Sequence, residues 1–126
     1  MRTLYTLCAL ISLILAALVA TAQPTATLDV TCDQNSDGTC STTTANPPTF
    51  SGSGLNQHKD YAVVGTSLFN GNFIDVLSSV NKQGNYSESS SDGVLPPDTW
   101  TFTLWELDHS GNLNNQLTSP QTLTFE

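Results

Sequence analysis

The fold of this 126-residue chain is decided by the stretch from Val80 to Leu113, which reads VNKQGNYSESSSDGVLPPDTWTFTLWELDHSGNL. Gly84-Asn85 and Gly111-Asn112 are turn dipeptides. Pro96-Pro97 bends the chain, because proline cannot donate a ladder hydrogen bond. From Trp100 to Leu107, apolar residues alternate with threonine and other residues, which indicates a strand with one buried face. The stretch therefore predicts antiparallel β-structure.

Similar short segments, separated by turn residues, continue on both sides of this stretch. The predicted strands run over 27–31, 40–45, 49–53, 61–69, 73–80, 86–90, 100–107 and 121–125. Asn70-Gly71-Asn72 predicts a hairpin between two of them. In 73–80, either Ile74 and Val76 or the alternate positions Phe73 and Asp75 can face the core. Seven or eight strands in about 100 residues predict a β-sandwich.

Five motifs follow one another along this part of the chain: FSGSGL, YAVVG, VNKQGNYSES, LPPDTWTFTLWELDHSGN and QTLTFE. In this order they resemble bacterial immunoglobulin-like domains, over Thr49 to Phe125. The resemblance implies an all-β, immunoglobulin-like antiparallel β-sandwich, a fold that adhesins, spacers and binding modules share. Two features depart from the family pattern. Asp98 stands where the family usually has glycine, and the segment from Cys32 to Cys40 has no counterpart.

Residues 1–22 have the pattern of a cleaved signal peptide. A positive start at Arg2 is followed by an apolar run and by the cleavage motif Ala20-Thr21-Ala22. A membrane anchor is the alternative, but the uncharged stretch only reaches the lower limit for spanning, about 20 residues. We expect one mature domain, made of an N-terminal strand and disulfide-closed loop (23–48) and a sandwich body (49–126). We expect it to be secreted, extracellular or at the cell surface, or periplasmic, without stable membrane insertion.

The chain is acidic, with 11 Asp and Glu residues against 3 Lys and Arg residues and a formal net charge of −8. Nucleic-acid affinity depends on basic residues that neutralise phosphates. Once Arg2 is removed with the signal peptide, only Lys59 and Lys82 remain. This composition excludes nucleic acid and anionic membrane surfaces as partners. We expect an extracellular protein or glycan as the partner, and a homo-oligomer is a further option.

Cys32 and Cys40 are predicted to form a disulfide, because paired cysteines in a small secreted chain read as a bridge. Between them, Asp33, Asn35 and Asp37 match the opening half of a calcium-binding loop. The twelfth position of such a loop needs a bidentate Glu and is a threonine here. The alternative is a turn rich in Asp and Asn that the disulfide closes. A weak calcium site is the one cofactor interpretation that the sequence leaves open.

Catalytic residues do not form a recognisable constellation. Four carboxylates are expected near one end of the sandwich: Asp92, Asp98, Glu106 and Asp108. Acid–base chemistry would need a cleft beside them, and solvated carboxylates that keep the sandwich soluble are the alternative. His58 and His109 lie in predicted turns far apart in the sequence, and zinc needs three or four ligands. We therefore expect no enzyme.

Alternation places Trp100, Phe102 and Leu104 in the core, and Trp105 and Leu107 on the opposite face. An exposed Trp-x-Leu pair can stack on a sugar, bind a protein or lie under a loop, and a bulge could turn Trp105 inward. We expect a secreted, non-catalytic module for adhesion, binding or a structural role. The alternatives are a carbohydrate-binding module that uses Trp105 and a subunit of an extracellular filament. In the filament, edge strands such as 121–126 would pair between copies.

Overall fold

A computed structural model describes residues 25–44 and 46–126 of the chain. The predicted signal peptide and the predicted mature start at Gln23 lie outside the described residues. Within those residues, no helix is long and apolar enough to cross a membrane.

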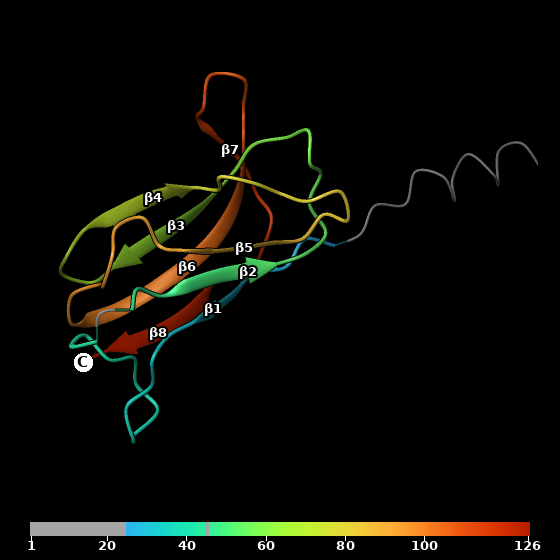
Figure 1. The fold of residues 1–126 in the computed structure, drawn as a ribbon. Helices are drawn as coiled ribbons and strands as arrows, with labels where there is room; N and C mark the ends of the chain where they lie inside the picture. Colours follow the sequence, from blue (N-terminus) through green and yellow to red (C-terminus); the bar gives the residue numbers. More distant parts are fainter. Residues whose placement is uncertain (1–24, 45) are drawn as a thin grey trace, which may run out of the picture.

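Eight strands form two antiparallel sheets that face each other (Figure 1). The strands are β1 (Asp29–Thr31), β2 (Thr49–Gly52), β3 (Tyr61–Ser67), β4 (Asn72–Val76), β5 (Tyr86–Ser89), β6 (Asp98–Leu107), β7 (Leu113–Gln116) and β8 (Gln121–Phe125). Sheet A has the order β1-β2-β5. Sheet B has the order β4-β3-β6, and both β7 and β8 pair with the far edge of β6. The predicted all-β sandwich is confirmed.

One predicted strand is absent from the structure, and one observed strand was not predicted. Residues 40–44 form no strand, and only Cys40 makes isolated bridges, to Gln34 and Phe125. Conversely, β7 was not predicted, because its sequence LNNQ is exposed throughout and has no apolar alternation. Its strand conformation depends on pairing with the last residues of β6.

Aromatic side chains fill the space between the sheets. Phe50 of sheet A lies 5.8 Å from Phe102 and 6.4 Å from Phe73, measured between ring centroids. Phe73 is also 5.5 Å from Trp100. Trp100, Phe102 and Leu104 are buried as predicted, because they share the face of β6 that points toward sheet A. Each such side chain contributes about 1.5–3 kcal/mol on burial.

The outer edge of β8 is covered. The Cys40 N–H donates to the Thr124 carbonyl (2.8 Å), and the Glu126 N–H donates to the Cys40 carbonyl (2.9 Å). The Gln121 side chain accepts from the Val30 N–H (2.9 Å) and donates to the Val30 carbonyl (3.2 Å), which joins sheet B to sheet A. Pairing of copies through this edge would therefore have to displace existing hydrogen bonds.

The predicted disulfide is confirmed. Cys32 and Cys40 are bonded, with a Cα–Cα distance of 5.6 Å. Cys40 is 1% exposed and belongs to the core cluster. The bridge therefore ties the loop between the two cysteines to the body of the sandwich.

Candidate functional site

The outer face of sheet B divides into an apolar half and a threonine half. In the apolar half, Val76 lies opposite Ala62, and Ala62 lies opposite Trp105. In the next row, Ile74 pairs with Val64. In the other half, outward positions of β6 and β8 are Thr99, Thr101, Thr103, Thr122 and Thr124.

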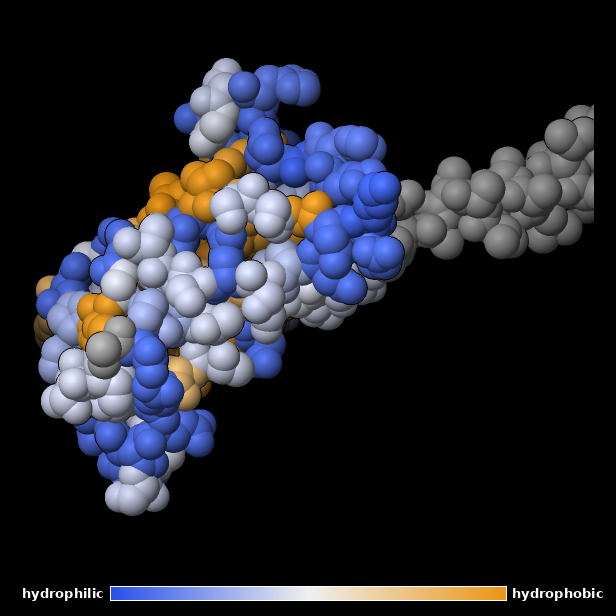
Figure 2. Space-filling view, viewed as in Figure 1, coloured by the Kyte–Doolittle hydropathy of each residue, from blue (hydrophilic) through white to orange (hydrophobic). Residues whose placement is uncertain are grey.

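The exposed apolar residues are concentrated in one hairpin, formed by β3, β4 and the turn between them, which we call the apolar hairpin (residues 61–76). Among the described residues, five large hydrophobic side chains are exposed, and four of them fall within Leu68–Val76. These four are Leu68 (72%), Phe69 (89%), Ile74 (56%) and Val76 (56%). Figure 2 shows apolar side chains gathered over β4. Concentrated exposure of this kind is typical of interaction surfaces, whereas single exposed hydrophobic residues are common on any protein.

Gly65 explains why the apolar residues of β4 point outward. Gly65 pairs with Phe73, and a Cβ at position 65 would overlap the Phe73 ring. The missing side chain leaves room for this ring in the core. Because side chains alternate along a strand, Ile74 and Val76 must then face solvent.

Asp98 anchors the tip of the apolar hairpin. Its carboxylate accepts hydrogen bonds from the N–H groups of Phe69 (2.9 Å) and Asn70 (3.1 Å) and from the Asn70 side chain (2.8 Å). Desolvation raises the pKa of Asp98, but these donors outweigh that effect and lower the pKa to about 2. Asp98 thus has a structural role that sequence reasoning missed.

No charged side chain points outward from the strands of sheet B in the described part of the chain. The outward positions are Ala62, Val64, Thr66, Asn72, Ile74, Val76, Thr99, Thr101, Thr103, Trp105, Leu107, Thr122 and Thr124, with polar or apolar residues of β7 beside them. In a chain with a net charge of −8, this face is therefore an uncharged region.

Trp105 lies half-buried on this outer face, over the fully buried Ala62. Its indole N–H donates to the Thr103 hydroxyl (2.9 Å). Of the alternatives for the Trp-x-Leu pair, burial under a loop applies to Leu107, since this side chain is 9% exposed. The loop before β3 covers it, and the Leu107 N–H donates to the Asp60 carbonyl (2.9 Å). A register shift between β6 and β7 falls after Trp105 and leaves it on the outer face.

The four carboxylates expected at one end of the sandwich do not form a cluster. Asp98 and Glu106 lie near opposite ends of the ten-residue strand β6. Glu106 pairs with Lys59 (3.0 Å), whereas Asp98 holds the hairpin tip. The structure therefore gives no support for paired acid–base carboxylates on this strand.

The two histidines lie close together, although the sequence placed them in separate turns. His58 and His109 line one depression of about 200 Å³ together with Asp60 and Asp108. Asp108 closes the β6–β7 turn by accepting from the N–H groups at positions 110 and 112, and the hydrogen bond from residue 112 lowers its pKa. Within the described residues, no group of three or more His, Cys, Asp or Glu side chains could hold a metal ion.

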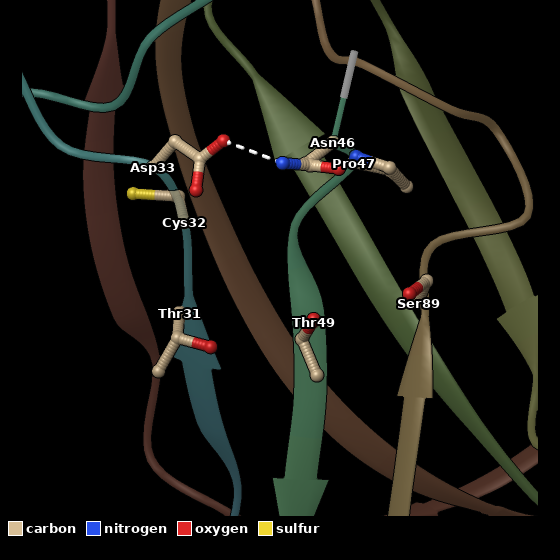
Figure 3. A pocket seen from close by; sticks show the side chains of 7 residues that line it. All are labelled: Thr31, Cys32, Asp33, Asn46, Pro47, Thr49 and Ser89. Carbon is tan, nitrogen blue, oxygen red and sulfur yellow. Dashed lines mark hydrogen bonds between the residues drawn. The ribbon is translucent and has the colours of Figure 1, made fainter. Parts of the chain in front are cut away.

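The side chains of the proposed calcium loop have separate partners. Asp33 accepts from the Asn46 side chain (3.0 Å), as Figure 3 shows. The Asn35 amide donates to the Thr39 hydroxyl (3.0 Å). Asp37 accepts from the hydroxyl (2.6 Å) and N–H (3.0 Å) of Thr39, which lower its pKa. Calcium binding here stays a prediction, and these contacts describe a turn held by its own side chains.

The depression beside this loop, about 310 Å³ in volume, is polar and open (Figure 3). It is lined by Thr31, Cys32, Asp33, Asn46, Pro47, Thr49 and Ser89. Asp33 is the only ionisable side chain among them that can titrate, because Cys32 is in the disulfide. The lining offers hydrogen bonds to a ligand but no nucleophile paired with a base.

Comparison with protein-family models, with curated proteins and with solved structures found no match for this chain.

Proposed function

We propose that this protein is a secreted, non-catalytic, immunoglobulin-like module that acts by protein–protein contact in adhesion or in an extracellular structure. The observation that carries the proposal is the apolar hairpin, where four large hydrophobic side chains are exposed within nine residues. The disulfide supports an oxidising compartment, because such bonds persist mainly outside the cytosol.

The character of the surface favours a protein partner. Protein interfaces have a core depleted in charge and enriched in aromatic residues, surrounded by a polar rim. The apolar hairpin supplies Phe69 and the aliphatic residues Ile74 and Val76, and threonines continue the same face. A patch of this kind lowers the solubility of a monomer, so its presence on an otherwise polar chain supports a binding role.

The test uses the purified protein, immobilised with its disulfide intact and exposed to the extracellular protein fraction of the producing cells. The variant replaces both hairpin-tip side chains, Leu68→Ser and Phe69→Ser. Both are highly exposed, so the fold should tolerate the change. The control is Leu113→Ser, at the fifth large hydrophobic residue that is exposed in the described part of the chain, which lies on β7.

We expect that the immobilised hairpin variant no longer retains the proteins that bind specifically to the native protein. The control variant should still retain them. Equal retention by the native protein and both variants, or no retention by any of them, would contradict the proposal.

A carbohydrate-binding function is the second candidate, and Trp105 is the observation that favours it. Its half-exposed ring lies on an uncharged face beside threonine hydroxyls, an arrangement suited to stacking on sugar. If sugar stacks there, Trp105→Ala should abolish retention on insoluble cellulose or chitin, while Leu113→Ser should not. Failure of the native protein to bind a panel of such polysaccharides would exclude this candidate.

A further inference from the structure

We propose that the partner of the apolar hairpin is a second copy of the chain, joined by antiparallel pairing of β4 with the same strand of the other copy. Ile74 of each copy would lie at the two-fold axis. This inference rests on the proposed function and names its partner, and it places the copies at the β4 edge rather than at the edge of β8.

The backbone of β4 is open for pairing. β4 is the terminal strand of sheet B, and its five-residue ladder with β3 has no register shift. The Ser67 N–H bonds to the Gly71 carbonyl, and the Leu77 N–H bonds to the Tyr61 carbonyl. Odd-numbered residues of β4 therefore pair with β3. The N–H and C=O groups of the even-numbered residues, 72, 74 and 76, point to the open edge.

Three of the usual protections of an edge strand, namely lysine, proline and a bulge, are missing from β4. Natural edges also use inward-pointing charges or a covering loop to prevent pairing with other chains. β4 reads NFIDV and has neither lysine nor proline. Its one charge, Asp75, is 4% exposed and faces inward, where it accepts hydrogen bonds from the Ser91 N–H and hydroxyl (2.9 Å each). The charge is thus held away from the outer face.

Two-fold symmetry at Ile74 gives a consistent register. Ile74 lies opposite its own copy, and Asn72 of each copy lies opposite Val76 of the other. These are the residues with free backbone groups, so the junction would form about six hydrogen bonds, two for each pair. On the inner face, Asp75 lies opposite Phe73 of the other copy, so no carboxylate faces another carboxylate.

The distribution of charge favours pairing of two copies at the β4 edge over pairing at the other sheet edges. From Tyr61 to Val80 the only charged residue is the buried Asp75, and the carboxylate of Glu88 reaches this segment from β5, where it accepts from the Ser78 N–H and hydroxyl. Elsewhere the acidic surfaces of two copies repel each other. The edge of sheet A at β5 contains Glu88, and β7 is polar and exposed throughout. β4 is therefore the edge where two copies meet with the least repulsion and the most apolar contact.

The hairpin tips add to the contact. Antiparallel pairing places the tip of each hairpin, with Leu68 and Phe69, beyond the Val76 end of the strand in the other copy. The two paired β4 strands and the two hairpin tips together form a small interface. Its buried area is near the lower limit of about 1,200 Å² for stable complexes. We therefore expect a dimer whose population depends on concentration.

The sharpest test is a single cysteine at the axis. Ile74→Cys places two thiols on directly opposed residues about 5.5 Å apart between Cα atoms, within the range that a disulfide spans. The control is Val64→Cys, on the same face but one strand further in. The two residues at position 64, one in each copy, would be three strand spacings apart, about 14 Å, which is too far for a disulfide. Cys32 and Cys40 are already paired, so each variant adds one free thiol to the described residues.

Under mild oxidation we expect Ile74→Cys to form a covalent dimer of twice the monomer mass and Val64→Cys to stay uncoupled. Sedimentation of the native protein should show a monomer–dimer equilibrium that Ile74→Lys shifts to monomer. Equal cross-linking of both cysteine variants, or a native protein that stays monomeric across the concentration series, would overturn the inference.

The two proposals can fail separately. If Ile74→Cys does not cross-link but the tip variant still loses retained extracellular proteins, the hairpin binds another protein and only self-pairing is wrong. If Ile74→Cys cross-links but the tip variant retains the same proteins as the native chain, self-pairing stands and the wider binding function is wrong.

Discussion

Two phenylalanines of this chain have opposite roles, one in the core and one at the surface. Phe50 is fully buried between the sheets, in contact with Phe73 and Phe102. Phe69 is 89% exposed at the tip of the apolar hairpin. The free energy of folding depends on the first ring, and we assign the second to binding.

Truncating these two rings should separate stability from association. Phe50→Ala leaves a cavity between the sheets and should lower the free energy of unfolding by about 3–5 kcal/mol. Phe69→Ala should change it by less than about 0.5 kcal/mol. Urea unfolding followed by tryptophan fluorescence measures both values. A large loss of stability from the Phe69 change would show that the tip is part of the core.

Asp98 should make the stability of the protein dependent on pH in acid. Its pKa of about 2 in the folded protein lies below the value of about 3.9 in an unfolded chain. The stabilisation by this carboxylate is therefore complete above about pH 4 and is lost as the pH falls through 2. In Asp98→Asn, the change in urea midpoint between pH 5 and pH 2 should be smaller than in the native protein. An identical pH profile in both proteins would contradict this role.

Among the elements, β1 and β8 show how a short strand is held at the margin of a sandwich. β1 has three residues and pairs with β2 on one side only. On its other side the Gln121 side chain takes the place of a neighbouring strand, because a carboxamide offers the same donor and acceptor as a peptide group.

Replacing Gln121 with leucine should destabilise this margin. The change leaves the N–H and C=O of Val30 without their partner in a partly buried position, which should cost about 1–3 kcal/mol. Denaturation and hydrogen exchange at the Val30 amide would measure the effect, with Gln116→Leu on the exposed strand β7 as control. Unchanged exchange at Val30 would show that water replaces the amide at no cost.

The disulfide closes a loop with a sequence separation of eight residues. Replacing Cys32 and Cys40 together with serine should lower the free energy of unfolding by about 2–3 kcal/mol, since the open loop has more freedom in the unfolded chain. Urea unfolding checks the value, and alkylation of the unreduced native protein should leave both cysteines unmodified. Equal stability of the double variant would mean that the hydrogen bonds of Cys40 to β8 suffice.

At the scale of the whole molecule, association between copies depends more on where the charges lie than on the net charge. The net charge of −8 keeps copies apart, while the outer face of sheet B carries no charge along its strands. This arrangement directs association to one face and edge.

Salt should therefore strengthen self-association. Raising the ionic strength from about 0.01 M to 0.15 M shortens the screening length from about 30 Å to about 8 Å, which reduces repulsion between the acidic copies. Sedimentation equilibrium should give a lower dimer dissociation constant at the higher salt, with Ile74→Lys monomeric at both. A higher dissociation constant in salt would indicate that ion pairs hold the copies together.

The sequence by itself determined the local features of this protein. Alternation along β6 predicted that Trp100, Phe102 and Leu104 are buried. Turn residues predicted the hairpin between β3 and β4, and the presence of two cysteines in a small secreted chain predicted their bridge. These features depend on neighbours in the chain and on one buried face, which a sequence pattern reports directly.

Tertiary structure alone decided the candidate site. β4 has apolar residues on both of its faces, so its sequence pattern could not tell which face is buried. The choice follows from the space that Gly65 leaves for Phe73, which lies on the neighbouring strand. Exposure of Ile74 and Val76, burial of Leu107 and the open edge of β4 likewise depend on contacts between residues distant in the sequence. The physical reason is that the pattern of one strand records its own periodicity, whereas burial is set by what packs against it.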